Sequence, residues 1–284
     1  MLKTKQKIKL ARLLQVVVIA ARRLTGLGAT ACVERKGVRW ELDLREGIDF
    51  SIWLLGSFEP KTIRCYQLLI KPGDVVLDIG ANIGAHTPHL AKCTGPQGRV
   101  IAFEPTDYAF AKLNRNIALN PSLAGRIQCL QYLLGEADSA DGPTASLYSS
   151  WPLKDEVNLH ELHRGRLMST QGASTRTLDS AIAALGLTQI DCIKLDIDGA
   201  ECAMLLGARQ MLTKWHPIIV MELAPYVLEE KGTSLAVLIG LLQEYGYGLS
   251  DAASGQALPM DAGRMQAAIP PGASLNVIAR ALAR

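Results

Sequence analysis

Short apolar runs alternate with helical patterns along most of the chain. Five runs of strand length occur in order, and apolar residues at helical spacing lie between them. Strands that are separated by helices need crossover connections, so they form a mostly parallel sheet covered on both faces. The pattern therefore predicts an α/β fold. The runs lie at residues 75–78, 99–104, 127–134, 191–196 and 217–222, and the helical patterns lie near residues 58–71, 86–93, 106–119, 177–185 and 200–213.

The carboxyl-terminal part of the chain departs from this alternation. After a helical pattern near residues 233–245 come two strand-like runs, at 245–249 and 275–279, with no convincing helix between them. Two strands without a crossover helix should pair antiparallel. The expected architecture is a Rossmann-like, doubly wound sheet that is mostly parallel and ends in a carboxyl-terminal antiparallel hairpin.

One α/β domain should account for residues 34–284. The 284 residues suit one large domain or two small ones, and 49% apolar residues suffice for a sizeable core. An alternating run at residues 38–44 reads as a half-exposed strand that precedes the sheet. The interval 136–176 is irregular and too long for an ordinary connection between a strand and a helix, so we expect a substrate loop or lid there.

Residues 1–33 form a basic segment with an apolar middle. They contain seven lysine and arginine residues and no acidic residue. The apolar run at residues 13–21 is too short to span a bilayer, but such a segment can lie on an anionic membrane. We therefore expect either a weak membrane-surface contact through residues 1–28, or a capping helix or solvated arm.

The remaining composition narrows the class of protein. A net charge of +3 is too small to indicate a nucleic-acid partner. The six cysteines include no C-x-x-C pair, which favours neither a zinc site nor a disulfide framework. The simplest expectation is a cytoplasmic protein, either free or peripheral to the membrane. The oligomeric state is left open.

A glycine-rich turn follows the first strand of the sheet. Asp78 ends that strand, and Gly80 and Gly84 flank the turn that contains Asn82. A dinucleotide site needs G-x-G-x-x-G, and the spacing here does not suit a pyrophosphate. Glu104 ends the next strand, 26 residues after Asp78, where its carboxylate could accept both hydrogen bonds of a ribose diol. These five residues predict a site for a nucleoside with a cationic amino-acid tail, although a tight turn without a ligand remains the alternative.

A second group of carboxylates follows the fourth strand. Asp196, Asp198 and Glu201 lie within six residues, directly after Lys194. Like charges at one place need a compensating cation, which could be a sulfonium, Lys194, a divalent metal or a positive helix end. Glu201 suits the first turn of the next helix equally well. Asp196 and Asp198, with Glu222 at the end of the fifth strand, are candidates for Mg²⁺, although such carboxylates also occur without metal.

The order of these motifs resembles the FkbM family of methyltransferases over residues 35–280. Asp198 departs from the family, which more often has glutamate at this position, and Phe58 stands where tyrosine is common. The terminal hairpin agrees, because it is characteristic of the class I methyltransferase variant of the doubly wound fold. The matching blocks are residues 75–84, 100–105, 113–116, 177–179 and 193–201, with residues 47–49 and 56–59 upstream.

The resemblance implies a methyl transfer that depends on S-adenosylmethionine. The acceptor it implies is a hydroxyl of a sugar, a glycan or a secondary metabolite. A hydroxyl is a poor nucleophile, so a base or a metal should help to remove its proton, and Asp196 and Asp198 are the nearest carboxylates. A nucleotide-dependent oxidoreductase and a non-catalytic protein that retains the fold are the alternatives. The histidines near these motifs or in the long loop, His86, His89, His160 and His163, are weaker candidates.

Overall fold

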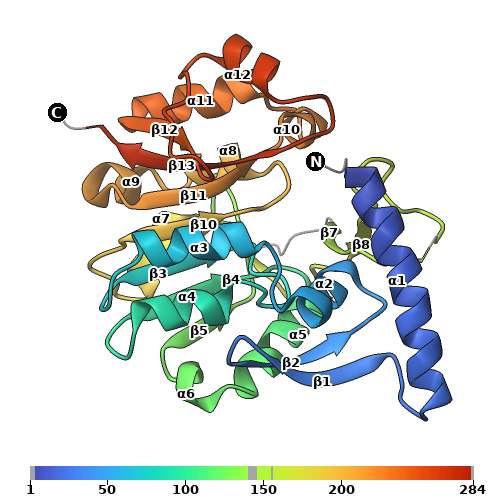
Figure 1. Ribbon diagram of the computed structural model, residues 1–284. Coiled ribbons are helices and arrows are strands. Elements are labelled where there is room, and N and C mark those ends of the chain that lie inside the picture. Colours follow the sequence, from blue (N-terminus) through green and yellow to red (C-terminus); the bar gives the residue numbers. More distant parts are fainter. Residues whose placement is uncertain (1–3, 140–145, 155, 283–284) are drawn as a thin grey trace.

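A seven-stranded sheet forms the centre of the protein (Figure 1). The computed structural model describes residues 4–139, 146–154 and 156–282 of the chain. In this part of the chain the strand order of the central sheet is β12-β13-β11-β10-β3-β4-β5. Only β13 runs against its neighbours, which confirms the predicted α/β sheet and its antiparallel end. The strands are β3 (Val75–Ile79), β4 (Arg99–Phe103), β5 (Ile127–Leu130), β10 (Cys192–Leu195), β11 (Ile218–Leu223), β12 (Tyr247–Asp251) and β13 (Leu275–Ala281).

Helices cover both faces of this sheet because successive strand residues point to opposite sides. In β3, Val76 belongs to a hydrophobic cluster with α3 and α4, whereas Leu77 belongs to the larger cluster with the helices of the other face. Both residues are fully buried. The first face carries α3 (Pro60–Leu69) and α4 (Thr87–Thr94), and the second carries α7 (Leu178–Ala184), α8 (Glu201–Leu206), α9 (Arg209–Trp215), α10 (Pro225–Glu230) and α11 (Leu235–Glu244).

Three local expectations from the sequence were wrong. The run at 127–134 is two strands, because the chain leaves the central sheet at Gln131, and β6 (Tyr132–Leu134) pairs instead with β9 (Ser174–Arg176). The helix expected at 200–213 is interrupted at Gly207, where the backbone of residue 135 leaves no room for a side chain. A helix, α12 (Ala262–Ala268), does lie between β12 and β13, and the Asp261 side chain caps it.

The amino-terminal segment packs beside the sheet domain. Helix α1 (Thr4–Leu24) leads into a hairpin of β1 (Thr30–Arg35) and β2 (Val38–Asp43), and α2 (Gly47–Leu55) follows. Their hydrophobic cluster contains Trp40, Phe50 and, from the glycine-rich turn, Ile83. The turn is therefore supported from outside the sheet. Within the described residues, no helix combines the length and the hydropathy that a membrane crossing requires.

The interval at residues 136–176 contains short strands rather than a wholly irregular loop. Strands β7 (Leu147–Ser150) and β8 (Arg166–Met168) form an antiparallel pair over the sheet edge. Residues 140–145 and 155 of this interval lie outside the described residues. The remaining helices are α5 (Asp107–Ala118) and α6 (Pro121–Ala124), and all six cysteines lie in the described parts as free thiols.

Candidate functional site

A crevice opens where the strand order reverses between β3 and β10. From β3 the chain proceeds through β4 to β5 on one side, and it returns through β10 to β11 on the other. Ligands of open α/β sheets bind beyond the carboxyl ends of the strands at such a point. The residues that follow β3 and β10 are the two motifs selected from the sequence, so the fold brings the glycine-rich turn and the acidic group together.

Asp78 is a buried carboxylate with one oxygen that accepts no hydrogen bond from the described residues. It has no exposed surface, and its Oδ2 accepts a hydrogen bond of 2.6 Å from Thr87 Oγ1. Its Oδ1 has no hydrogen-bond partner among the described residues, and Lys194 Nζ lies 3.5 Å away. Burial raises the pKa of Asp78, although Lys194 and Thr87 oppose this shift. The charge of Lys194 offsets part of the cost of burying this oxygen, and Oδ1 can still accept a hydrogen bond from a cationic ligand group.

Lys194 joins the two motifs. Its Nζ donates to the backbone oxygens of Gly80 and Ile79 at 2.6 and 3.2 Å, and it lies 3.7 Å from Asp196 Oδ2. Burial disfavours its charge, but the carboxylates of Asp196 and Asp78 more than offset this, and the pKa of Lys194 is raised. Lys194 is thus the cation that compensates the acidic group, one of the four possibilities that the sequence left open.

The two glycines of the turn have different neighbours. Gly80 and Gly84 both have positive φ, of 77° and 85°, as the sequence predicts for a tight turn. A side chain at Gly80 would collide with the carbonyl oxygen of Asp196, whereas one at Gly84 would lie 2.9 Å from Leu113 Cδ1. Gly80 therefore allows the two strand-end loops to touch each other.

Asn82 and Glu104 form the side of the crevice beyond the turn. The backbone N–H of Asn82, at φ 50°, donates to Glu104 Oε2 at 2.9 Å. Glu104 Oε1 accepts from Thr106 N at 2.9 Å and from Thr106 Oγ1 at 2.5 Å. Burial raises the pKa of Glu104, and these bonds oppose the rise. Each carboxylate oxygen has two lone pairs, so Oε2 can accept a further bond from a ligand hydroxyl.

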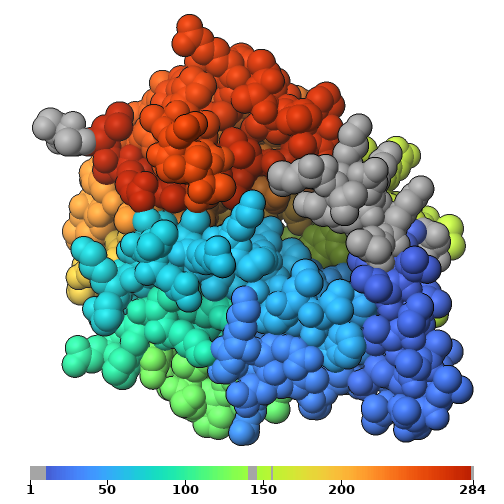
Figure 2. Space-filling model, in the orientation of Figure 1, coloured from blue at the N-terminus to red at the C-terminus, as the bar shows by residue number. Residues whose placement is uncertain are grey.

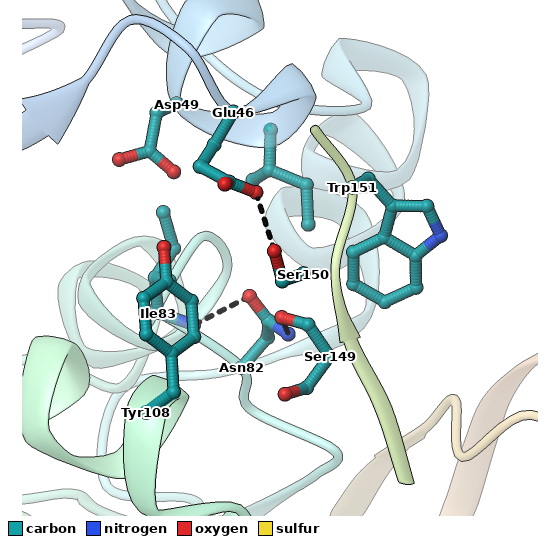
Figure 3. A pocket seen from close by; sticks show the side chains of 9 residues that line it. Glu46, Asp49, Asn82, Ile83, Tyr108, Ser149, Ser150 and Trp151 are labelled. Carbon is teal, nitrogen blue, oxygen red and sulfur yellow. Dashed lines mark hydrogen bonds between the residues drawn. The ribbon is translucent and has the colours of Figure 1, made fainter. Parts of the chain in front are cut away.

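The segment around β7 (the β7 segment, residues 146–154) covers this side of the crevice. Asn82 Nδ2 donates to the backbone oxygen of Ser149 at 2.9 Å, and Thr106 Oγ1 lies 2.8 Å from Ser149 Oγ. Ser150 Oγ donates to Glu46 Oε2 at 2.8 Å, as Figure 3 shows. Arg166 Nη2 binds the other Glu46 oxygen at 3.0 Å. Sequence reasoning missed these contacts, because no motif marks Glu46 or Ser149.

A second cavity lies at the carboxyl ends of β10 and β11 and contains three carboxylates. Glu59, Asp196 and Glu222 line it together with Lys194 and Asn276. Burial, followed by the charge of Asp196, raises the pKa of Glu59 and raises that of Glu222 to about 8. Glu59 was not selected as a site residue, although it ends the upstream block at 56–59. It reaches the cavity because it precedes α3 in a left-handed conformation, with φ 44°.

Asp198 and Glu201 have separate roles in the loop after β10. Glu201 Oε1 accepts the backbone N–H groups of Ile197 and Gly199, each at 3.3 Å, and so holds the loop at the start of α8. Burial raises the pKa of Glu201 to about 7. Asp198 is left-handed with φ 48°, and burial together with the charges of Asp196 and Glu201 raises its pKa to about 8. Strained backbone of this kind collects at functional sites, which favours Asp198 over Glu201.

Residues 78–249 match a family model described as the methyltransferase FkbM domain. The chain belongs to the FkbM methyltransferase family. Membership confirms the resemblance and decides against the nucleotide-dependent oxidoreductase that the sequence left open.

Two methyltransferases are similar to this chain over most of their own length. The 2-O-methyltransferase NoeI of Sinorhizobium fredii is 28% identical over 184 residues, which are 63% of this chain and 75% of NoeI. The 31-O-demethyl-FK506 methyltransferase FkbM of Streptomyces tacrolimicus is 28% identical over 222 residues, which are 66% of this chain and 78% of the relative. A solved structure, methyltransferase FkbM from Methylobacillus flagellatus, aligns with a TM-score of 0.46 at 16% identity, covering 76% of this chain and 50% of that one.

The side chains that come close enough together to bind a metal ion lie outside the crevice. Among the described residues, the side chains whose ligand atoms converge within 4.8 Å are His160, His163 and Glu230, and not Asp196, Asp198 and Glu222. The Nδ1 atoms of both histidines accept backbone N–H groups, so the neutral rings carry their protons on Nε2. The two rings also stack in parallel, with their centroids 3.7 Å apart, and His160 Nε2 lies 3.0 Å from Glu230 Oε2. This arrangement opposes metal ligation.

The other two histidine candidates lie under the crevice. His86 is buried, and its Nδ1 lies 3.3 Å from Tyr66 Oη while its Nε2 lies 3.9 Å from Glu59 Oε2. Burial keeps the pKa of His86 well below its usual value. His89 is buried against Trp40, and burial lowers its pKa to about 4. Both rings therefore act as neutral packing groups, and His86 supports Glu59.

Proposed function

We propose that this FkbM-family chain transfers a methyl group from S-adenosylmethionine to a hydroxyl of a sugar, a glycan or a secondary metabolite. The observation that carries the proposal is the fully buried carboxylate of Asp78 at the reversal of strand order, whose Oδ1 accepts no hydrogen bond from the described residues and has Lys194 Nζ 3.5 Å away. The relatives named as a 2-O-methyltransferase and a 31-O-demethyl-FK506 methyltransferase support a hydroxyl acceptor.

The residues of the crevice fit the two ends of this cofactor. When bound, S-adenosylmethionine supplies a methyl group on a positively charged sulfur. Asp78 would accept the ammonium of the amino-acid tail, and Glu104 would accept a ribose hydroxyl through Oε2. Asn82 holds Glu104 through its backbone N–H at 2.9 Å. Since Ser149 lies against Asn82 and Thr106, we infer that the β7 segment shifts when the cofactor enters and closes again to exclude water.

The acidic cavity would bind the acceptor. The pKa of Glu222 is raised to about 8, so this carboxyl is largely protonated at neutral pH and can donate as well as accept hydrogen bonds with hydroxyls. Burial also raises the pKa of Glu59, whose oxygens can accept hydrogen bonds from the same acceptor. Orientation of the acceptor can supply about 7–11 kcal/mol of the barrier. Asp198 would take the proton of the acceptor hydroxyl while the hydroxyl oxygen bonds to the methyl carbon and the bond from that carbon to sulfur breaks. Asp196 would keep Asp198 basic through its charge.

Calorimetry tests the cofactor half of the proposal. The wild-type protein should bind S-adenosylmethionine and not NAD. Asp78→Asn and Glu104→Gln should each weaken binding about tenfold or more, because each loses a charge-assisted hydrogen bond. Glu34→Gln is the matched control, since Glu34 is exposed and pairs with Arg39 in the hairpin. Circular dichroism of each variant checks folding. Binding of NAD alone would refute the proposal.

A methyl-transfer assay tests the second half of the proposal, the transfer of the methyl group to a hydroxyl. The protein and S-adenosylmethionine are incubated with sugars, glycans and cell extracts, and mass spectrometry follows the gain of a methyl group. Products methylated on oxygen are expected. Cofactor binding without any transfer, to hydroxyl acceptors or to extracts, would favour the non-catalytic alternative.

A further inference from the structure

Helix α1 has two apolar faces, and the protein covers only one of them. Ala11 and Val18 pack against the cluster of the β1–β2 hairpin, and Gln15 between them is 1% exposed. The opposite face of the helix points away from the protein, and Figure 2 shows this amino-terminal part, in blue, at one edge of the molecule.

The outer face carries a stripe of large apolar side chains (the α1 stripe: Leu13, Val16, Val17 and Leu24). Their exposed fractions are 65%, 61%, 60% and 90%. The spacing of three, four and eleven residues from Leu13 places all four on one face of a helix. Contiguous exposed apolar surface of this kind marks an interaction site.

The charge of the segment determines which partner fits the α1 stripe. Residues 1–33 contain seven cations and no acid, and Arg23 lies exposed near the end of the helix. A second copy docked about a two-fold axis would bring two such basic segments together, which repels them. An anionic lipid surface offers both an apolar layer for the stripe and negative headgroups for the cations.

We propose that the outer face of α1 docks onto an anionic lipid bilayer, with the helix lying in the plane of the headgroups. The inner face of α1 packs against the hydrophobic cluster that also contains Leu153 of the β7 segment. Docking of α1 does not depend on the methyl transfer.

Vesicle co-sedimentation of the full chain tests the proposal. The wild-type protein should sediment with vesicles of phosphatidylcholine and phosphatidylglycerol, and should stay in solution with phosphatidylcholine alone. Val17→Asp places a negative charge in the α1 stripe and should reduce binding about tenfold. Leu68→Asp is the matched control, because Leu68 is an exposed apolar residue of α3, 85% exposed, on another surface. It should bind like the wild type.

Two further measurements separate membrane docking from misfolding and from self-association. Thermal unfolding of both variants should show that the fold is kept, since Val17 and Leu68 are exposed. Sedimentation velocity without lipid reports the oligomeric state. The proposal would be overturned if the wild-type protein did not sediment with anionic vesicles. It would also be overturned if the Val17→Asp variant bound these vesicles like the wild type. A dimer that Val17→Asp dissociates, with no vesicle binding, would assign the stripe to a second copy instead.

Discussion

Replacing Gly80 with alanine should destabilise the protein by roughly 2–5 kcal/mol, the sum of a left-handed conformation and overpacking. Gly80 has φ 77°, a conformation that costs any residue with a Cβ atom. The new methyl group would also collide with the carbonyl oxygen of Asp196. This oxygen belongs to the backbone, so no change of side-chain rotamer can relieve the collision. Thermal unfolding should show a fall in Tm of about 3–8 °C for a domain of this size.

A second glycine separates the two contributions. Gly246 has φ 78°, and a Cβ there would meet nothing within 4 Å. Gly246→Ala should therefore cost only about 1–2 kcal/mol, from the backbone conformation. The difference between the two variants measures the contact between Gly80 and Asp196. Equal losses of Tm would show that the two loops do not press on each other.

The contact at Gly80 changes the interpretation of the glycine-rich turn. Sequence reasoning assigned the glycine to a ligand that approaches the backbone. In the structure the close neighbour is Asp196, and Lys194 Nζ bonds the Gly80 carbonyl oxygen at 2.6 Å. The turn and the acidic group are thus one unit, although 115 residues separate Ile79 from Lys194. Periodicity and motif spacing predict each loop, and neither predicts that the loops touch.

Elements with a strong local signal were predicted well. The buried strands β3, β4, β10 and β11 are continuous apolar runs, and the antiparallel end followed from the order of the last two strands. Because parallel strands end at one edge of a sheet, Asp78, Glu104 and Asp196 could be expected at the same crevice. The predicted boundaries of strands and helices were wrong where tertiary contacts determine them. At Gln131 the chain leaves one sheet for another, and at Gly207 the backbone of residue 135 approaches the helix.

The missed site residues have no local signal. Glu59 reaches the acidic cavity through its left-handed conformation and because α3 begins beside β13, where Asn276 donates a hydrogen bond to Thr62 at 3.1 Å. Glu46 and Ser150 meet because the β7 segment folds back over the turn, which brings residues 104 positions apart into contact. The acidic cavity is built from such distant segments, so its carboxylates could be predicted only in part.

Asp198 should also make the stability of the protein depend on pH. Its folded-state pKa of about 8 lies above the ordinary value of 3.8, so the folded protein holds this proton more tightly than the unfolded chain. The resulting stability is complete below pH 4 and is lost as the pH rises through about 8. Asp198→Asn, which has no proton to lose, should therefore gain Tm relative to the wild type as the pH is raised. A constant difference in Tm between pH 4 and pH 9 would contradict the raised pKa.

The same substitution should reduce kcat about 10²- to 10⁴-fold, the usual contribution of a general base. Below pH 8 less than half of Asp198 is ionised, so kcat of the wild type should rise with pH, reach half its maximum near pH 8 and level off above it. Asp198→Asn should lose this rise, while calorimetry finds its affinity for S-adenosylmethionine within about twofold of the wild type, since Asp78 and Glu104 are untouched.

A variant of Glu222 tests whether the general base is Asp198 or Glu222. Its pKa is also raised to about 8, by burial and by the charge of Asp196, so a rise of kcat with pH alone does not distinguish the two carboxyls. Glu222→Gln should raise KM, because Glu222 lines the acceptor cavity, and should keep most of kcat and its rise with pH. If Glu222→Gln abolishes that rise and Asp198→Asn preserves it, Glu222 is the base. Because Asp196 raises both pKa values, Asp196→Asn should move the rise in kcat to lower pH whichever carboxyl takes the proton.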